Sequence, residues 1–151
     1  MEGQITGQAD LAKDWHRRAG DLAQACAGSF AGEESARLAD LATLLANTPR
    51  PVGELLGWPA SAVRVEAAPA DGALAAVLRL IETCRGGYLL SWGAGGGHLA
   101  SVVLPGGAEV TLGADSAGLA LIGALALAFA EREPLRVQGT PLYRPDSIRL
   151  N

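Results

Sequence analysis

The residues of this sequence best suited to chemistry gather around a glycine-rich run, Gly-Ala-Gly-Gly-Gly at residues 93–97, which His98 follows directly. Histidine exchanges a proton near neutral pH, and Asp115, at the start of a predicted helix, is placed to orient it. Loops of small residues also often carry contacts with ligands or partners. We therefore take Gly95, Gly96, His98 and Asp115 as the candidate ligand-binding residues.

Two more specific functions for this run are disfavoured by its surroundings. A phosphate-binding loop leads into a helix and ends in Gly-Lys-Ser/Thr, whereas this run leads into a predicted strand. A nucleophile must lie within about 3 Å of its base, but Ser91 and Ser101 fall on the sheet face opposite His98. We therefore predict no catalytic residue. An enzyme would require His98, Asp115 and a serine to converge in a closed pocket.

The histidines and cysteines are too scattered to predict a metal site. His16, His98, Cys26 and Cys84 show neither the Cys-x-x-Cys nor the His-x-x-x-His spacing. Both cysteines occupy apolar positions of predicted helices and lie far apart in the sequence, which favours two buried thiols over a disulfide. Free thiols are typical of a reducing compartment. We expect a cytoplasmic protein with no metal and no cofactor.

Composition and charge limit the classes of function. The chain has 151 residues, 49% of them hydrophobic and 5% aromatic, and a net charge of −4. A chain of this length and apolar content forms one globular domain with its own core. The acidic balance argues against a nucleic-acid partner held by a broad basic face. Lys13 is the only lysine, a usage that indicates GC-rich, bacterial coding, and the polar first fourteen residues contain no signal segment.

Three short strands joined by tight turns are predicted at residues 88–92, 98–104 and 108–112, because apolar and polar residues alternate there. A three-residue turn at Pro-Gly-Gly would set Val102 opposite Val110. In that register one face of an antiparallel meander is almost wholly apolar, and a slip of one residue would mix the faces. The polar residues on the other face are Ser91, Ser101, Glu109 and Thr111.

A helix with almost no polar face is predicted to follow the meander. No charged residue lies between its cap, Asp115 or Ser116, and its last turn at Glu131. Such a helix must be covered on more than one side, and it is shorter than the roughly 20 residues of a membrane span. It is either a core helix of this chain, or it packs on the sheet with one side and on a partner subunit with the other. The second alternative makes Leu121 and Leu125 interface residues.

The fold class that these patterns predict is α+β, a single domain in which helices pack on one face of an antiparallel sheet. Asp71 is predicted to cap the helix before the meander, and Gly86 or Gly87 to end it. The expected elements are a loose arm at 1–8, helices at 9–27, 33–46 and 73–84, a helical turn within 52–58, and strands at 62–66 and 135–137. The expected subregions are a helical hairpin (1–48), a linker (49–72), an α-βββ-α core (73–138) and an extended tail (139–151).

The few aromatic residues are candidates for an interface. Trp92 stands at the hairpin tip, nearly opposite His98, and Tyr143 lies in the tail, so the burial of either would require another chain. The function favoured is a non-enzymatic cytoplasmic interaction module, adaptor or chaperone-like, that binds a partner segment or itself as a homodimer. One alternative is a small-ligand-binding protein or enzyme that uses the 93–97 loop with His98 and Asp115. The other is a structural component of a phage or another assembly.

Overall fold

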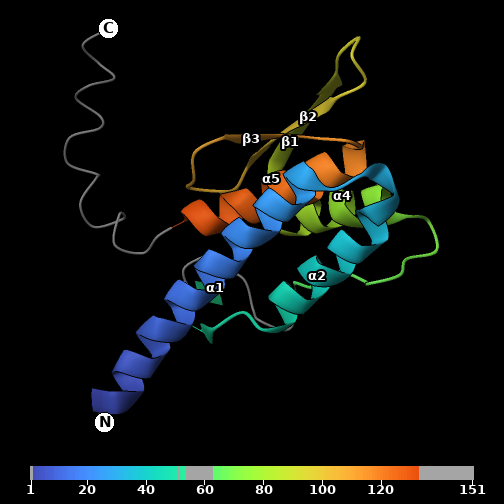
Figure 1. Cartoon of the computed structure of the whole chain (residues 1–151). Coiled ribbons are helices and arrows are strands. Elements are labelled where there is room, and N and C mark those ends of the chain that lie inside the picture. Colours follow the sequence, from blue (N-terminus) through green and yellow to red (C-terminus); the bar gives the residue numbers. More distant parts are fainter. Residues whose placement is uncertain (1, 51, 54–62, 133–151) are drawn as a thin grey trace, which may run out of the picture.

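The structure is a computed structural model that describes residues 2–50, 52–53 and 63–132 (Figure 1). Within those ranges the chain forms four helices and a three-stranded antiparallel sheet, which confirms the α+β prediction. The elements in order are α1 (Glu2–Gly28), a 3-10 turn η1 (Ala31–Glu33), α2 (Glu34–Ala46), α4 (Ala73–Thr83), β1 (Gly87–Trp92), β2 (His98–Val103), β3 (Val110–Ala114) and α5 (Ala117–Glu131).

The sheet has the predicted order and register. Its strands lie in the order β1-β2-β3, with Val102 opposite Val110 and His98 opposite both Trp92 and Ala114. The third strand keeps this register but begins and ends two residues later than predicted, because residues 104–109 form the turn after β2. Its tightest part is closed by Gly107 N–H, which donates to the Leu104 carbonyl at 2.9 Å.

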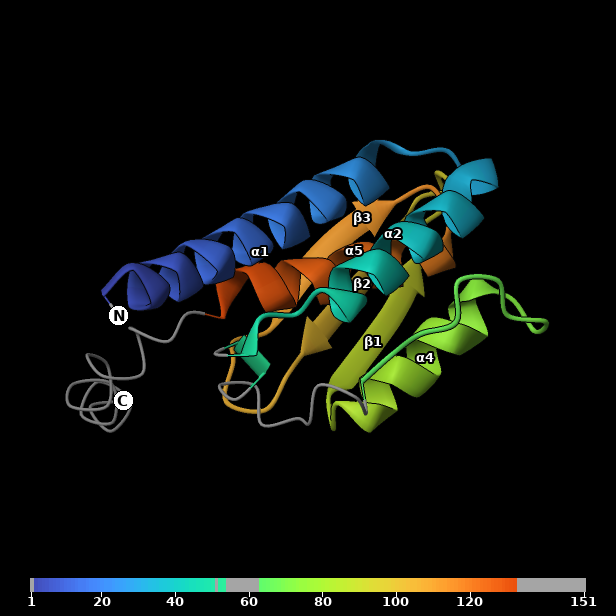
Figure 2. The ribbon, with the colours of Figure 1, turned by 90° about the horizontal axis from the view of Figure 1, so that it is seen from below.

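All four helices lie on the same side of the sheet (Figures 1 and 2). Helix α5 packs directly against β2 and β3, and α1, α2 and α4 surround it. The sheet contributes Ala100 and Val102 to the core, and both are fully buried. The opposite face of the sheet is uncovered in the described part of the chain.

The apolar helix α5 is enclosed by its own chain. Leu121 and Leu125 are completely buried, as are Leu119, Ile122 and Phe129. The prediction that Leu121 and Leu125 form an interface with another subunit is therefore wrong, because α1, α2, α4 and the sheet cover the sides of the helix that the sequence left open. The core-helix alternative is the one that the structure bears out.

Small residues let the neighbouring elements approach α5 closely. A Cβ atom added at Gly123 would lie 2.7 Å from Leu112 Cδ2 and 2.9 Å from Cys26 Cβ. Real non-bonded carbon atoms do not come so close, since their optimal separation is about 3.5–4.0 Å. Gly123 is therefore the point at which α1, α5 and β3 meet.

Several local predictions fail for identifiable reasons. The loose arm at 1–8 is wrong, because α1 begins at Glu2 and runs for 27 residues. No strand forms at residues 63–66; Val63 is buried without pairing to the sheet. Asp71 does not cap α4, because its carboxylate accepts hydrogen bonds from the Arg79 guanidinium, and Gly72 stands at the cap position.

The end of α4 is also unlike the prediction. The residue in the left-handed conformation is Arg85, with φ of +61°, rather than a glycine. Arg85 N–H donates to the Glu82 carbonyl and Gly86 N–H to the Ile81 carbonyl, both at 2.9 Å, which is the Schellman arrangement. Of the helical turn predicted at 52–58, residues 52 and 53 are helical, and the rest lies outside the described residues. The strand at 135–137 and the tail lie outside them as well.

Candidate functional site

The four candidate ligand-binding residues lie around one open hollow at the end of the sheet. Gly95, Gly96, His98 and Asp115 all line it, and its volume is about 600 Å³. The register brings them together, because His98 pairs with Ala114, the residue before Asp115. The hairpin loop is closed by Gly93 N–H donating to the Gly97 carbonyl at 3.1 Å. Most of the remaining lining is glycine and alanine, so it offers backbone more than side-chain groups.

The hollow does not contain a catalytic constellation. Asp115 Oδ2 accepts a hydrogen bond from Ala31 N–H at 2.7 Å, so the carboxylate ties the α1–α2 connection to the start of α5. Among the described residues it makes no hydrogen bond with His98, whose ring instead lies against Trp92 at 6.4 Å between centroids. Ser101 is on the opposite sheet face, where its hydroxyl bonds to Thr111 at 2.8 Å. No serine, histidine and aspartate converge here.

The start of α5 is held by Ser116 rather than by Asp115. Its hydroxyl oxygen accepts from Leu119 N–H at 3.1 Å and donates to the Glu34 carboxylate. A capping side chain of this kind satisfies a free N–H group of the first helical turn. The contact with Glu34 also attaches α2 to α5, so both carboxylates near the hollow serve to hold the helices together.

The two cysteines are free, and their surroundings make them poor nucleophiles. Burial raises the pKa of the Cys26 thiol to about 12 and that of the Cys84 thiol to about 11. A thiol must lose its proton to attack an electrophile or to bind a metal. Within the described ranges no group of three or more His, Cys, Asp or Glu residues could hold a metal ion.

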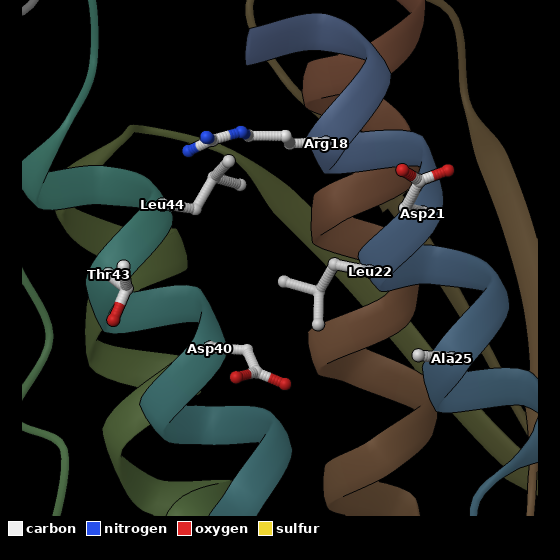
Figure 3. A pocket seen from close by; sticks show the side chains of 7 residues that line it. All are labelled: Arg18, Asp21, Leu22, Ala25, Asp40, Thr43 and Leu44. Carbon is white, nitrogen blue, oxygen red and sulfur yellow. The ribbon is translucent and has the colours of Figure 1, made fainter. Parts of the chain in front are cut away.

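A second concavity, of about 320 Å³, lies between α1 and α2 (Figure 3). Leu22 and Leu44 are buried beneath it, while Arg18, Asp21 and Asp40 lie around its rim. Each of these charges pairs along its own helix. Arg18 Nε lies 3.1 Å from Asp14, Asp21 lies 3.2 Å from Arg17, and Asp40 lies 3.3 Å from Arg37. The groove thus offers no unpaired charge to a ligand.

Three exposed apolar side chains lie on the face of the sheet that no described helix covers, here called the open face. Leu89, Leu99 and Val103 are exposed there by 64%, 50% and 39%. Ser101 and Thr111 lie beside them and bond to each other. The eight residues whose side chains share this face in the observed register are Gly87, Leu89, Ser91, Leu99, Ser101, Val103, Thr111 and Gly113.

Comparisons with protein-family models, with curated proteins and with solved structures find no match for this chain. Its function is therefore inferred from the geometry of the described residues. No helix in those ranges is long and apolar enough to cross a membrane.

The other predicted interface residues have different outcomes. Trp92 is 75% exposed and stands at the hairpin tip on the inner side of the sheet, away from the open face. Tyr143 lies outside the described residues. Sequence reasoning missed Leu89, Leu99 and Val103, although the alternation placed them on the same face as the serines. It also missed Phe30, an exposed side chain beside the α1–α2 turn.

Proposed function

We propose that this chain is a non-enzymatic protein-interaction module whose contact surface is the open face of the sheet. The observation that carries the proposal is the exposure of Leu89, Leu99 and Val103 together on one face, in a fold whose apolar helix is otherwise enclosed. A scattered exposed leucine needs no explanation, but apolar residues grouped on one face are typical of an interaction surface.

The chemistry of the open face specifies the surface that it would bind. None of its eight residues carries a charge. A charged partner surface would therefore lose water without gaining a counter-charge. The partner accordingly presents an uncharged, largely apolar surface. The cytoplasm is the proposed location, supported by the two free cysteines.

The shape of the open face also suits docking. A Cβ atom at Gly113 would lie 3.3 Å from Leu99 Cδ2, and one at Gly87 would lie 3.3 Å from Val103 Cγ1. The side chains of Leu99 and Val103 therefore lean over the neighbouring strands instead of standing upright. They fill the space above Gly113 and Gly87, where a sheet packed about 10 Å away would meet them.

A photo-crosslinking experiment in the native host tests the proposal without assuming who the partner is. A photoreactive amino acid at position 89 is expected to form adducts with protein. The matched control is position 11, where another leucine is 59% exposed on α1, away from the sheet. The absence of adducts at 89, or equal adducts at both positions, would contradict the proposal.

A second candidate function is the binding of a small ligand in the hollow beside the 93–97 loop. It is favoured by the convergence of Gly95, Gly96, His98 and Asp115 on one concavity of about 600 Å³, within the usual range of ligand pockets. The test is to follow the His98 ring by NMR during a screen of small polar fragments. Shifts that saturate at His98 and leave His16 unchanged would support it, and an unresponsive His98 would refute it.

A further inference from the structure

The open face has the properties expected of a surface that pairs with itself. A two-fold symmetric interface brings each residue of a patch against the same patch of the other subunit, so the patch must be complementary to itself. A charged patch would repel its own copy. The open face satisfies this requirement because all eight of its positions are uncharged. Glu109, predicted for this face, lies in the turn before β3 and is not one of them.

The net charge of the chain favours this uncharged face as the contact between two copies. The net charge is −4, so two copies repel each other over most approaches. Charges are screened within about 8 Å at physiological salt. Two sheets that meet on their uncharged faces place their charged helices on the far sides, which keeps most of the like charges beyond that distance.

The apolar residues are also placed so that a two-fold axis can superpose them. Leu89 pairs with Ser101, and Leu99 and Val103 lie two residues to either side of Ser101 on β2. Diagonal neighbours of this kind on one sheet face are about 7–8 Å apart. An axis that lies in the interface and runs across the strands, over Leu89 and Ser101, sets Leu89 against its own copy and Leu99 against Val103 of the other copy.

We infer that the occupant of the open face is a second copy of this chain, packed sheet to sheet about such an axis. This inference rests on the proposed function and names its partner. The face limits the strength of the pairing. Three strands about 4.8 Å apart, each of about six residues at about 3.3 Å, cover roughly 14 by 20 Å. This is well below the roughly 800 Å² per partner of a stable complex, so we expect a dissociation constant of about 0.1–1 mM.

Sedimentation equilibrium of the full chain at protein concentrations from about 10 µM to 1 mM tests this inference. The wild type is expected to pass from monomer to dimer across that range. Leu89→Glu and Leu99→Glu are each expected to raise the dissociation constant at least about tenfold, because each buries a carboxylate against its own copy. The control Leu11→Glu leaves it unchanged. Circular dichroism and thermal unfolding of each variant establish that it is folded.

A charge-exchange experiment tests the two-fold geometry itself. Leu89→Glu and Leu89→Lys should each be monomeric alone, because like charges meet at the axis. An equal mixture of the two should form a heterodimer. If the mixture associates no more strongly than either variant alone, the axis over Leu89 is wrong.

The two proposals fail in different ways. A wild-type chain that stays monomeric at 1 mM, or an association that Leu11→Glu weakens as much as Leu89→Glu does, would overturn the second-copy inference. Adducts at position 89 with a different protein in the host would then leave the proposed interaction module standing.

Discussion

Gly123 provides the sharpest test of how the core is built, because alanine there has two opposing effects. Alanine is favoured over glycine in a helix interior by about 0.8–1.0 kcal/mol. The added Cβ, however, would meet Leu112 Cδ2 at 2.7 Å and Cys26 Cβ at 2.9 Å. Overpacking of this kind destabilises by about 1–3 kcal/mol. We therefore expect Gly123→Ala to lower the free energy of unfolding, by up to about 2 kcal/mol.

The same substitution at Gly20 is the matched control, because it lies in the interior of α1. The nearest atom to its added Cβ is Ala130 Cβ at 3.8 Å, an ordinary contact. Gly20→Ala should therefore stabilise the protein by about 0.5–1 kcal/mol. At about 2–4 °C per kcal/mol for a chain of this size, the two variants should shift the melting temperature in opposite directions.

Thermal unfolding followed by circular dichroism, together with urea unfolding, measures both changes. Shortening the neighbour in a Leu112→Ala background should make Gly123→Ala less damaging, because both of the close δ-carbons are removed. If Gly123→Ala stabilises the protein as much as Gly20→Ala does, the close packing of α1, α5 and β3 at Gly123 is wrong.

Three further predictions concern the helix ends and the thiols. Arg85→Gly should stabilise by about 0.5–1 kcal/mol in urea unfolding, since φ of +61° suits glycine; a loss of stability would contradict the Schellman ending. Ser116→Ala should destabilise by about 1–2 kcal/mol, because it removes the cap on Leu119 N–H and the bond to α2; unchanged stability would refute both roles. The pKa of Cys26 is raised to about 12 and that of Cys84 to about 11, so the folded state keeps both thiols protonated to higher pH than the unfolded state does. Their contribution to stability should be complete below the unfolded pKa of about 8.5 and should decline as the pH rises towards 11–12. Urea unfolding at pH 8 and pH 10 checks this, and Cys84→Ala should show a weaker decline.

The strand register could be predicted because it depends on local alternation. A period of two over residues 98–104, with a glycine turn after it, leaves one pairing that keeps the apolar side chains on one face, and Val102 does lie opposite Val110. The convergence of His98 and Asp115 follows from the same register. These features require contacts only between neighbouring strands and the helix that begins directly after them.

The covering of α5 could not be predicted in the same way. Its apolar pattern shows that it must be covered, but the identity of the cover depends on contacts between distant segments. Cys26 and Gly123 meet across almost a hundred residues, and His16 Nδ1 bonds to the Phe129 carbonyl at 2.9 Å. Periodicity within α5 contains no information about these partners.

The open face was overlooked because its apolar residues alternate in space with polar ones. Leu89 faces Ser101, and Leu99 faces Ser91, so a list of the polar residues on that face leaves out its apolar ones. Glu109, which was also placed there, lies before β3 and outside the sheet. The alternation does not show whether these apolar side chains are covered, whereas the structure shows that they are exposed. The sequence pattern placed the exposed apolar surface on α5, but the structure buries that helix. The exposed apolar residues lie instead on the face of the sheet opposite α5. Under the proposed function, the contact surface is therefore the uncovered face of the sheet and not α5.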